Sequence, residues 1–435
     1  MSGLYLYDDS CAREFEPFAL TRPLADMVAG AAVQRERWQT ALQLPIVGLI
    51  TAEHLENFDE GTSSPIASGG IPAGSVIANA RFVPKLSAIQ LPAMGAAPND
   101  DIGAVDLWLS GGRVVAARTS RELPVDYFAA GRLTLDDVGR SGAESTTLAG
   151  WWINDVWDLV RLLPEQLTDD LAFYQRPSFG GVIAGTQLAP PPEHAIVLGK
   201  HPVLVAADRW IAGELFVKGA TIEPQVVFDA AAGPIYVGAG TTVQAFTRLV
   251  GPCYVGRHST VLGDRISICS IGDHCKVRGE MSNTIMIGYA NKGHDGFVGH
   301  SYMGRWVNLG AGTITSNLKN TYGPVTLWTP RGMRDTGMQF LGTLFGDHAK
   351  TGIGTNLTTG TVLGAAANVY GGQTPPKAVP PFAWGSAPPY AVYRLDKFVE
   401  VVERVMARRQ VKLTERGREQ LTAAHRARWT VGESE

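Results

Sequence analysis

Mostly apolar side chains recur at every sixth position in two blocks of the sequence, and this period constrains the fold more than any other feature. Three hexads span 18 residues in each block, from Val237 to Val255 and from Phe345 to Leu363. Glycine directly follows many of these positions. The repeating positions are Val237, Val243, Val255, Val261, Ile271 and Val277 in the first block, and Phe345, Thr351, Leu357, Leu363 and Val369 in the second.

This period predicts a triangular coil. A residue at every sixth position points into a narrow prism, and the next residue lies at a corner, where a small side chain or a positive φ is needed and glycine supplies either. One coil cannot bury its own inward face, so successive coils stack. We therefore expect a left-handed parallel β-helix of hexapeptide repeats, which also accounts for much of the 50-glycine content. A glycine-rich β-sandwich would alternate with period two instead.

The rest of the chain predicts two further parts. Residues 1–188 indicate a Rossmann-like α/β domain, with strands near residues 4–7 and 46–50, a hairpin near 107–118, and helices near 27–44 and 154–174. We expect the β-helix over residues 189–385, with a protruding loop near 314–340. Residues 386–435 predict a helical segment with one apolar face, which suits a solvated helix or packing against a neighbouring subunit.

Composition excludes several classes of protein. A formal net charge of −3 argues against a nucleic-acid binder, and no apolar run reaches the ~18 residues of a membrane span. The first residues do not resemble a secretion signal. The four cysteines lack C-x-x-C spacing, so we expect a reduced, cytoplasmic protein in which the three cysteines of the repeat block are core residues.

The most specific motif lies between the two repeat blocks. Gly293-His294 is followed by the run Asn308-Leu-Gly-Ala-Gly-Thr-Ile-Thr-Ser-Asn317, and Glu280 precedes both. At this spacing the chain resembles the bifunctional N-acetylglucosamine-1-phosphate uridyltransferase/glucosamine-1-phosphate acetyltransferase family. It resembles most the sugar-nucleotidyltransferase branch of that family, whose hallmarks match residues 18–24, 291–296 and 316–322.

The resemblance implies N-acetylation of an amino-sugar phosphate or nucleotide sugar by acetyl-CoA, in the pathway to UDP-N-acetylglucosamine, at sites between the subunits of a homotrimer. An amine is mostly protonated at pH 7, so its attack on a thioester needs a base that titrates near neutrality, and histidine is the usual choice. His294 is the candidate base. Glu280 would fix its tautomer, as carboxylates do for catalytic histidines, and Asn317 completes the expected catalytic set.

Other residues are candidates for binding the substrates. The expected acceptor-binding residues are Asn308, Phe297, Lys292, Arg265 and Arg278, and the expected acyl-CoA-binding residues are Gly310, Ala311, Gly312 and Lys350. Backbone N–H groups of the glycine-rich run would serve the oxyanion or the pantetheine arm. Two departures leave the acceptor sugar open, because Phe297 stands where the family has Tyr and Ser282 where it has Lys.

The N-terminal domain lacks the glycine-rich phosphate loop of the uridyltransferase family. Weaker nucleotide-binding candidates stand in its place. Arg22 can bind phosphate, and Asp26 can hold Mg²⁺ or simply pair with Arg22 at a helix start. Asn79 stands where a metal-binding carboxylate is expected, and Arg81 lies in the same segment. An NTP and Mg²⁺ are therefore possible ligands of a changed nucleotide site, and the domain can equally have none.

Three alternatives stay open. The protein can be a nucleotidyltransferase with the β-helix as a trimerisation scaffold, or a non-catalytic sensor of sugar nucleotides. A zinc site of His274, His294 and His300 is the third, although their spacing does not match that of zinc-binding β-helices. No metal ligand is assigned.

Overall fold

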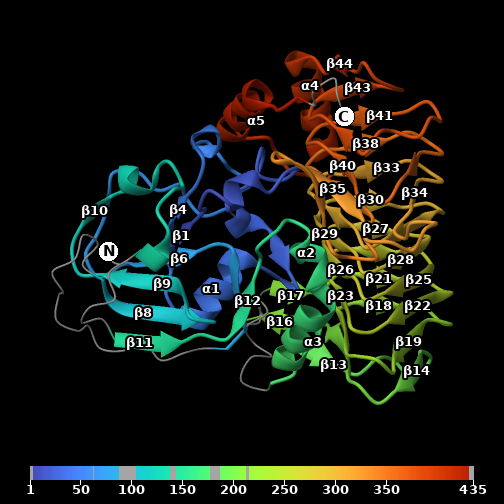
Figure 1. Ribbon diagram of the computed structural model, residues 1–435. Helices are drawn as coiled ribbons and strands as arrows, with labels where there is room; N and C mark the ends of the chain where they lie inside the picture. The colour runs from blue at the N-terminus through green and yellow to red at the C-terminus, as the bar shows by residue number, and fades with distance from the viewer. Residues whose placement is uncertain are drawn as a thin grey trace. The chain divides into compact units, whose positions relative to one another are not determined.

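The computed structural model describes residues 3–61, 63–87, 104–137, 144–176, 187–211 and 215–430. The chain divides into two compact units (Figure 1). Unit 1 contains Met1–Val156 and Met406–Ala427, and unit 2 contains Trp157–Val405 and Arg428–Glu435. No helix of the described chain is long and apolar enough to cross a membrane.

Unit 1 is built on a six-stranded mixed sheet of order β11-β8-β9-β6-β1-β4. Its strands are β1 (Leu4–Tyr7), β4 (Ile46–Ile50), β6 (Val76–Asn79), β8 (Ala104–Ser110), β9 (Arg113–Thr119) and β11 (Glu144–Thr147). Strands β4, β1 and β6 are mutually parallel, whereas β9 runs antiparallel to β6 and β8. Alternate residues of β1 enter different hydrophobic clusters, with Leu4 and Leu6 in one and Tyr5 and Tyr7 in the other, so both faces of the sheet are covered. This is the expected Rossmann-like arrangement.

Short elements complete unit 1. They are β2 (Val28–Ala29), β3 (Ala32–Val33), β5 (Gly70–Ile71), β7 (Phe82–Pro84), β10 (Leu123–Pro124), β12 (Gly150–Trp152) and the 3₁₀ turns at Ala12–Glu14, Leu24–Asp26, Glu53–Leu55, Val125–Phe128 and Leu135–Asp137. The helix expected over 27–44 is shorter, because β2 and β3 form a tight hairpin and α1 covers only Gln34–Leu42. Trp38 and Leu42, one turn apart on α1, are fully buried.

The C-terminal helix α5 (Glu415–Ala427) belongs to unit 1. Gln420 donates from Nε2 to the carbonyl of Thr21 at 3.2 Å, and Thr414 donates to Asp59 at 2.8 Å. Helix α5 therefore packs within the N-terminal unit, whereas the residues after it, Arg428–Glu435, belong to unit 2.

Unit 2 is a three-faced parallel β-helix, as the hexads predicted. One coil illustrates the path: β23, β24 and β25 lie in three different sheets, and β26 returns to the first. The first face consists of β13 (Gln187–Ala189), β15 (Val203–Ala207), β20 (Ile235–Val237), β23 (Cys253–Val255), β26 (Ser270–Asp273), β29 (Ile285–Gly288), β32 (Tyr302–Met303), β37 (Thr343–Phe345), β40 (Thr361–Leu363) and β42 (Ala378–Val379).

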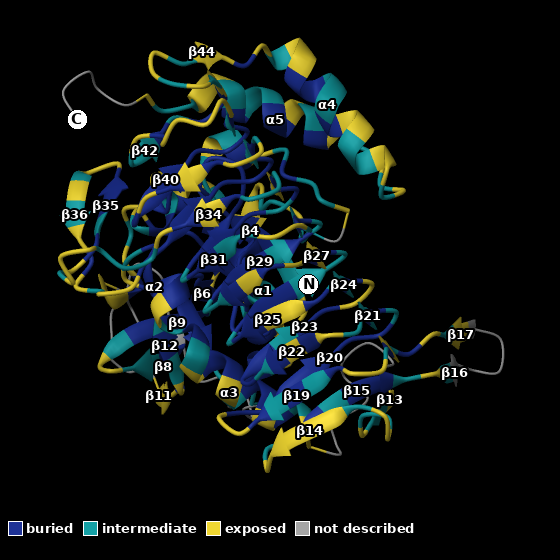
Figure 2. Ribbon diagram, turned by 90° about the vertical axis from the view of Figure 1, so that its right-hand side faces the viewer, coloured by how far each residue is buried: buried dark blue, intermediate teal, exposed yellow. Residues whose placement is uncertain are grey.

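The other two faces have the same order along the stack. The second consists of β18 (Thr221–Ile222), β21 (Thr242–Val243), β24 (Thr260–Val261), β27 (Lys276–Val277), β30 (Asn291–Lys292), β33 (Asn308–Leu309), β38 (Lys350–Thr351), β41 (Asn368–Val369), β43 (Ala383–Gly385) and β44 (Ala391–Val392). The third consists of β14 (Ile196–Gly199), β19 (Val227–Ala230), β22 (Thr247–Val250), β25 (Asp264–Ser267), β28 (Glu280–Ser282) and β31 (Phe297–Gly299), with the pair β34 (Ile314–Thr315) and β39 (Asn356–Leu357) beyond them. The first strand of this face, β14, is exposed throughout (Figure 2).

The hexad residues fill the prism. Val237, Val255, Val261 and Val277 are all fully buried in one cluster, and the same cluster contains Cys253, Cys269 and Cys275. These three cysteines are free thiols, and burial raises the pKa of Cys269 to about 12. They are core residues, as expected.

Glycine follows the hexad residue because neighbouring coils approach closely. A Cβ on Gly256 would lie 2.8 Å from the carbonyl carbon of Gly272, and one on Gly272 would lie 2.2 Å from the carbonyl oxygen of Ile287. The positive φ comes two residues later, at Gly240 and then at His258 and the residues stacked on it. Of the two explanations for the corner glycines, the need for a small residue is therefore the one that applies.

The positive-φ corner carries a ladder of rings. His258, His274, Tyr289, Trp306 and His348 stack in succession, with centroid separations of 5.0, 4.6, 4.3 and 6.3 Å. A left-handed conformation costs a side-chain-bearing residue roughly 1–2 kcal/mol, and aromatic pairs return about 0.5–1.5 kcal/mol each. Stacking between coils therefore stabilises residues that the corner alone would disfavour.

The remaining elements lie beside or above the coils. They are β16 (Arg209–Ile211), β17 (Leu215–Val217), the hairpin β35 (Thr326–Thr329) and β36 (Gly332–Asp335), and helices α2 (Asp158–Arg161), α3 (Leu163–Tyr174) and α4 (Leu395–Ala407). The hairpin lies in the expected protruding loop, and Trp328 on β35 stacks on Trp429 at 4.1 Å. Helix α2 begins at Asp158 without a side-chain cap, later than the expected start at Asn154 or Asp155.

Candidate functional site

The predicted base, His294, lies on an enlarged corner of the β-helix. Two residues separate β24 from β25 and β27 from β28, but four residues, 293–296, separate β30 from β31. The two extra residues carry His294 and Asp295 outward, and both are exposed. Among the described residues, no side chain makes a hydrogen bond or ion pair with the His294 ring. The imidazole is therefore available to a substrate.

Charged side chains surround this corner. The Nε of Arg278 lies 3.1 Å from Asp295 and 3.5 Å from Asp264, and Arg265 pairs with Glu280 at 3.3 Å. In the described structure Glu280 therefore contacts Arg265 rather than His294, so the expected orienting contact is not formed within this chain. All these groups are at least 46% exposed, so the pairs contribute little to stability, and Arg265 and Arg278 can exchange them for a phosphate.

Asn317 and Phe297 converge on the outer side of Gly299. A Cβ on Gly299 would lie 2.5 Å from Cζ of Phe297 and 2.6 Å from Nδ2 of Asn317, so only glycine fits beneath them. Phe297 is also the register partner of Glu280. The β-helix thus brings three of the predicted site residues onto neighbouring positions of one face.

His300 is part of the same cluster. Its Nδ1 lies 2.9 Å from Nδ2 of Asn317, and its ring stacks on Phe340 with centroids 5.3 Å apart. An amide nitrogen donates, so Nδ1 accepts and the neutral ring carries its proton on Nε2. Burial lowers the pKa of His300 to about 4. At pH 7 His300 is therefore neutral and its Nδ1 is the acceptor that fixes Asn317, and it is not suited to be the base.

Two of the three N–H groups of the glycine-rich run that we expected to be free are used within the chain. The N–H of Gly310 donates to the carbonyl of Thr351 at 3.1 Å, and the N–H of Gly312 donates to the carbonyl of Asp295 at 3.0 Å. The Ala311 carbonyl accepts from Gly354 at 2.8 Å. The expectation of an oxyanion hole at Gly310 and Gly312 is therefore wrong for this chain, because coil-to-coil hydrogen bonds use both N–H groups.

A polar column follows one outer face. Asn291 donates to Asn308 at 3.3 Å, and Asn308 is exposed and pairs in register with Lys350. Burial lowers the pKa of Lys350 to about 8, and its Nζ donates to the carbonyl of His348 at 3.2 Å. Asn308 and Lys350 are adjacent across coils, as one binding surface would require.

Lys292 does not fit the expected phosphate contact. Its side chain is fully buried and its Nζ donates to backbone carbonyls inside the prism. An ammonium in that place cannot reach a solvent-borne phosphate without leaving the core.

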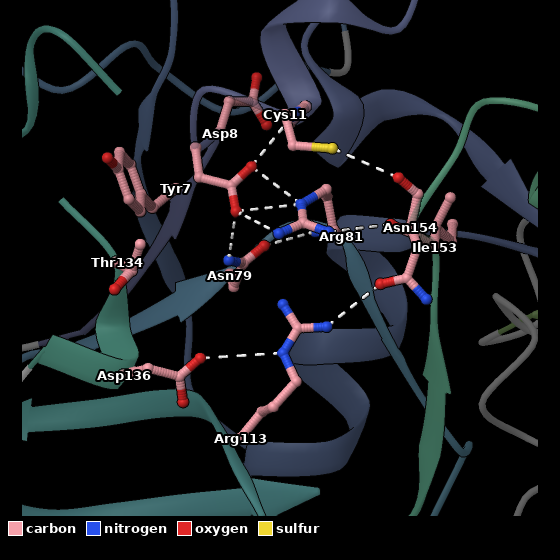
Figure 3. Close-up of polar contacts among 12 residues, drawn as sticks. Tyr7, Asp8, Cys11, Asn79, Arg81, Arg113, Thr134, Asp136, Ile153 and Asn154 are labelled. Atoms are coloured by element: carbon pink, nitrogen blue, oxygen red, sulfur yellow. Dashed lines mark hydrogen bonds and ion pairs between the residues drawn. The ribbon is translucent and has the colours of Figure 1, made fainter. Parts of the chain in front are cut away.

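Unit 1 has a second polar centre at the carboxyl ends of its parallel strands, where open α/β sheets bind ligands (Figure 3). Asp8 and Asp9 follow β1, and Asn79 ends β6. Arg81 donates from Nε to Asp9 Oδ1 at 2.8 Å and from Nη2 to Oδ2 at 2.6 Å, and Asn79 donates to Asp9 at 2.9 Å. Burial raises the pKa of Asp9, but the bonds from Arg81 and Asn79 outweigh it, so the net pKa is lowered.

Asp8 differs from Asp9 because, among the described residues, no arginine or lysine pairs with its carboxylate; Arg13 donates instead to its backbone carbonyl at 2.9 Å. Its Oδ2 accepts from Thr51 at 2.8 Å and from the N–H of Leu24 at 3.3 Å. Its buried Oδ1 has no partner among the described residues. Burial raises the pKa of Asp8 to about 7, so this carboxyl is held partly protonated near neutrality.

Arg113 reaches the same centre from β9. Its guanidinium lies 3.6 Å from the ring centroid of Trp152, 3.1 Å from Asn154 Oδ1 and 3.7 Å from Asp136 (Figure 3). Burial, followed by the charge of Arg81, lowers the pKa of Arg113. Two cations are thus held near one another, and the ion pair of Arg113 with Asp136, at 3.7 Å, is longer than that of Arg81 with Asp9, at 2.6 Å.

The other two nucleotide-binding candidates have structural partners. Arg22 is buried, donates to both oxygens of Glu60 at 2.7 and 2.8 Å and lies 5.6 Å from the Phe58 ring centroid. Asp26 accepts from Arg35 at 2.8 Å. The expected pair between Arg22 and Asp26 is therefore not formed, because Arg22 pairs with Glu60 and Asp26 with Arg35.

A metal centre is not formed by the described residues, in which no three His, Cys, Asp or Glu side chains converge. His274 stacks between His258 and Tyr289, and His300 is bound to Asn317, so the three candidate zinc ligands lie in different surroundings. In unit 1 both oxygens of Asp9 are used by Arg81, so Asp9 does not fit the role of a Mg²⁺ ligand.

Sequence reasoning missed His300, Asp8, Asp9 and Arg113 as members of these centres. Asp8 and Asp9 directly follow a predicted strand, which is a signal that sequence alone offers. The roles of His300 and Arg113 depend on partners 17 and 41 residues away, Asn317 and Asn154, and no local spacing indicates them.

Parts of this chain are similar in sequence to known proteins. Residues 4–178 match the family described as sugar nucleotidyl transferase. This match confirms the resemblance to sugar nucleotidyltransferases that the sequence motifs indicated. An acetyltransferase of Escherichia coli O6:K15:H31, YaiX, described as uncharacterized, is 27% identical over 150 residues, which are 34% of this chain and 65% of YaiX. The bifunctional protein GlmU of Acaryochloris marina is 30% identical over 145 residues, 32% of this chain and 28% of GlmU.

A third relative combines both activities in its name. The bifunctional sugar-1-phosphate nucleotidylyltransferase/acetyltransferase of Sulfurisphaera tokodaii is 30% identical over 93 residues, 21% of this chain and 23% of that protein. The matches thus span 65% of YaiX and about a quarter of each bifunctional protein. The shared names support a transferase of the sugar-nucleotide and acetyl-transfer kind.

Proposed function

We propose that unit 2 transfers an acetyl group from acetyl-CoA to the amine of an amino-sugar phosphate or a nucleotide amino sugar. The observation that carries the proposal is the exposed His294 ring, which has no partner among the described side chains and stands beside two arginines with exchangeable partners. The similarity to YaiX and to the bifunctional proteins supports acetyl transfer.

The surroundings of each residue indicate its role in the proposed reaction. His294 removes a proton from the amine as the nitrogen attacks the thioester carbon, so that a C–N bond forms, the C–S bond breaks and CoA leaves with a proton. Asn317, whose Nδ2 is used by His300, keeps its Oδ1 for the amine or a sugar hydroxyl. Arg265 and Arg278 bind the phosphate in place of Glu280 and Asp295.

The remaining predicted residues serve the donor side. Asn308 is expected from the sequence on the acceptor side, but it is adjacent to Lys350 across coils, so we place both on the donor side, where they offer an amide and a cation to acetyl-CoA. The resemblance implies a homotrimer with sites between neighbouring β-helices, and the proposal includes this assembly. Light scattering of the purified protein tests it.

The activity is tested by following CoA release with glucosamine 1-phosphate and related amino sugars. We expect His294→Ala to lower kcat by about 10²- to 10⁴-fold, the usual contribution of a general base. His258→Ala is the matched control, because His258 is an exposed histidine of the same unit that lies in the ring ladder. No CoA release with any amino sugar, or equal activity of His294→Ala and wild type, contradicts the proposal.

Unit 1 supports a second candidate function, the binding or nucleotidyl transfer of a sugar phosphate. The match of residues 4–178 favours transfer, and the paired arginines Arg81 and Arg113 favour an anionic ligand. Pyrophosphate release from UTP, dTTP, CTP or GTP with Mg²⁺ and a sugar 1-phosphate tests transfer. Binding of a sugar nucleotide without turnover identifies unit 1 as a sensor, and loss of that binding in Arg113→Ala locates the ligand.

A further inference from the structure

Lys292 occupies an inward position of the β-helix that neighbouring coils fill with aliphatic residues. It pairs in register with Val277, and the preceding coil places Val261 there. Lys292 is fully buried, as those valines are. Lysine is almost never fully buried without partners, so this position requires an explanation.

The Lys292 ammonium finds its hydrogen-bond acceptors in two corners of the β-helix, one at residues 278–279 and one at residues 293–296. Nζ donates to the carbonyl of Arg278 at 3.1 Å and to the carbonyl of His294. A Cβ on Gly279 would lie 2.9 Å from Nζ, and one on Gly296 would lie 3.4 Å from it. Glycines at both corners, with φ of 86° and 127°, leave room for the ammonium between the two turns of backbone.

The enlarged corner needs such a donor. Its four residues cannot follow the two-residue path of the coils below, and the His294 carbonyl turns inward, where a backbone oxygen must be paired. The next carbonyl, of Asp295, is held by the N–H of Gly312 at 3.0 Å. Two successive carbonyls are thus tied to the prism, one of them by a side chain, and the first of them belongs to His294 itself.

We propose that Lys292 is a positioning residue for His294, fixing from inside the prism the corner loop 293–296 that presents the imidazole. It touches no substrate, and the inference rests on the proposed function only for its effect on catalysis. Burial lowers the pKa of Lys292 to about 8, although the negative charges of Asp295 and Asp264 raise it. A charged lysine at this position therefore costs stability. A residue kept for stability alone would be aliphatic, as in the neighbouring coils.

Lys292→Met separates positioning from a structural role. Methionine fills a similar volume without a charge, so the cost of burying an ammonium is removed, and this offsets the loss of the two hydrogen bonds to backbone carbonyls. We therefore expect an unchanged or higher melting temperature. The backbone amides of residues 293–296 should exchange with deuterium at least about tenfold faster, since the His294 carbonyl loses its donor. The exchange of β27 and β33 should not change.

Lys276→Met is the matched control, because Lys276 is an exposed lysine on β27, in the same sheet. It should leave melting temperature and loop exchange unchanged. Lys292→Gln, which keeps a shorter donor, should give intermediate exchange and serves as the second variant if Lys292→Met does not fold. In the CoA-release assay Lys292→Met should lower kcat about tenfold with little change in KM, because the base is displaced while the substrate contacts remain.

The outcomes are distinct. Unchanged exchange of residues 293–296 in both Lys292 variants overturns the inference. A fall in melting temperature with faster exchange throughout unit 2 also overturns it, in favour of a purely structural role. If wild-type protein releases no CoA with any amino sugar, the proposed function fails, while the exchange measurement still decides whether Lys292 holds the loop.

Discussion

The two polar centres of this chain use similar residues in opposite ways. At the carboxyl edge of unit 1, Asp9 and Arg81 are 8% and 9% exposed and use their hydrogen-bonding groups on one another and on nearby backbone. At the enlarged corner of unit 2, Glu280 and Arg265 are 54% and 50% exposed and His294 projects without a side-chain partner among the described residues. The first arrangement stabilises a fold, and the second is open to a reacting molecule.

The difference follows from where each backbone places its polar groups. Strand ends of a covered sheet are dry, so a carboxylate there must find a cation or lose its charge, and Asp9 and Asp8 show these two outcomes. A β-helix corner faces solvent, so charged side chains remain ionised without fixed partners. Chemistry that needs a free base therefore fits unit 2 better than unit 1.

Among the variants that test this comparison, Asp9→Ala is expected to lower the free energy of unfolding most. Removing one member of a buried pair leaves the charge of Arg81 uncompensated, which costs about 3–5 kcal/mol. Deuterium exchange of peptides from β1 and β6 should report a loss of that size. The double variant Asp9→Leu with Arg81→Met is the control, since it removes both charges and should recover most of the loss. A change below about 1 kcal/mol for Asp9→Ala would mean that this centre is as solvated as the corner.

His300→Phe sharpens the comparison at the other centre. The ring and its stack on Phe340 remain, but Asn317 loses its acceptor, so we expect KM for the amino sugar to rise about tenfold, the value of one hydrogen bond to a polar substrate. The measurement is the CoA-release assay with varied acceptor. His258→Phe, in the ring ladder, is the control and should not change KM. If His300→Phe lowers kcat as much as His294→Ala does, His300 rather than His294 is the base.

Much of the architecture was predictable because the β-helix is periodic. Each coil needs an aliphatic side chain that points inward, and Val237, Val255 and Val277 meet this need at regular intervals. The sequence shows this spacing directly. The positive-φ corner was not predictable, because His274 and Tyr289 are stable there only through stacking with rings one coil away. Tertiary contacts of that kind override local preference.

The candidate site stays a prediction, although the structure shows where its residues lie. His294 is identified by its motif, and its exposure agrees with the assigned role. Lys292 was misplaced, because its neighbours in sequence are polar and nothing local shows that alternation turns this lysine inward. Gly310 and Gly312 were misjudged because their N–H partners, Thr351 and Asp295, come from other coils.

The pH dependence of unit 1 tests whether its carboxyl edge is dry. The pKa of Asp8 is raised to about 7 in the folded state and is ordinary in the unfolded chain, so the folded state binds more protons between about pH 4 and 7. The contribution of Asp8 to stability is fully present at low pH and is lost as the pH rises through 7. In Asp8→Asn this loss should be absent, so the difference in melting temperature between the proteins should change steadily over that range. Parallel curves would show that Asp8 is solvated.

The smallest effect is expected from Arg265→Ala at the corner. Arg265 and Glu280 lie 3.3 Å apart, but both are half exposed, and such pairs contribute about 0.2–1 kcal/mol. We expect the free energy of unfolding to fall by less than about 1 kcal/mol, and the difference to shrink further at about 1 M salt, where the Debye length is about 3 Å. Arg248→Ala is the control, because Arg248 precedes Arg265 in the same column and pairs with Asp229 outside the proposed site. Only Arg265→Ala should weaken binding of a phosphorylated acceptor. A loss of stability near that of Asp9→Ala would show that the corner is a buried network after all, and the contrast between the two centres would fail.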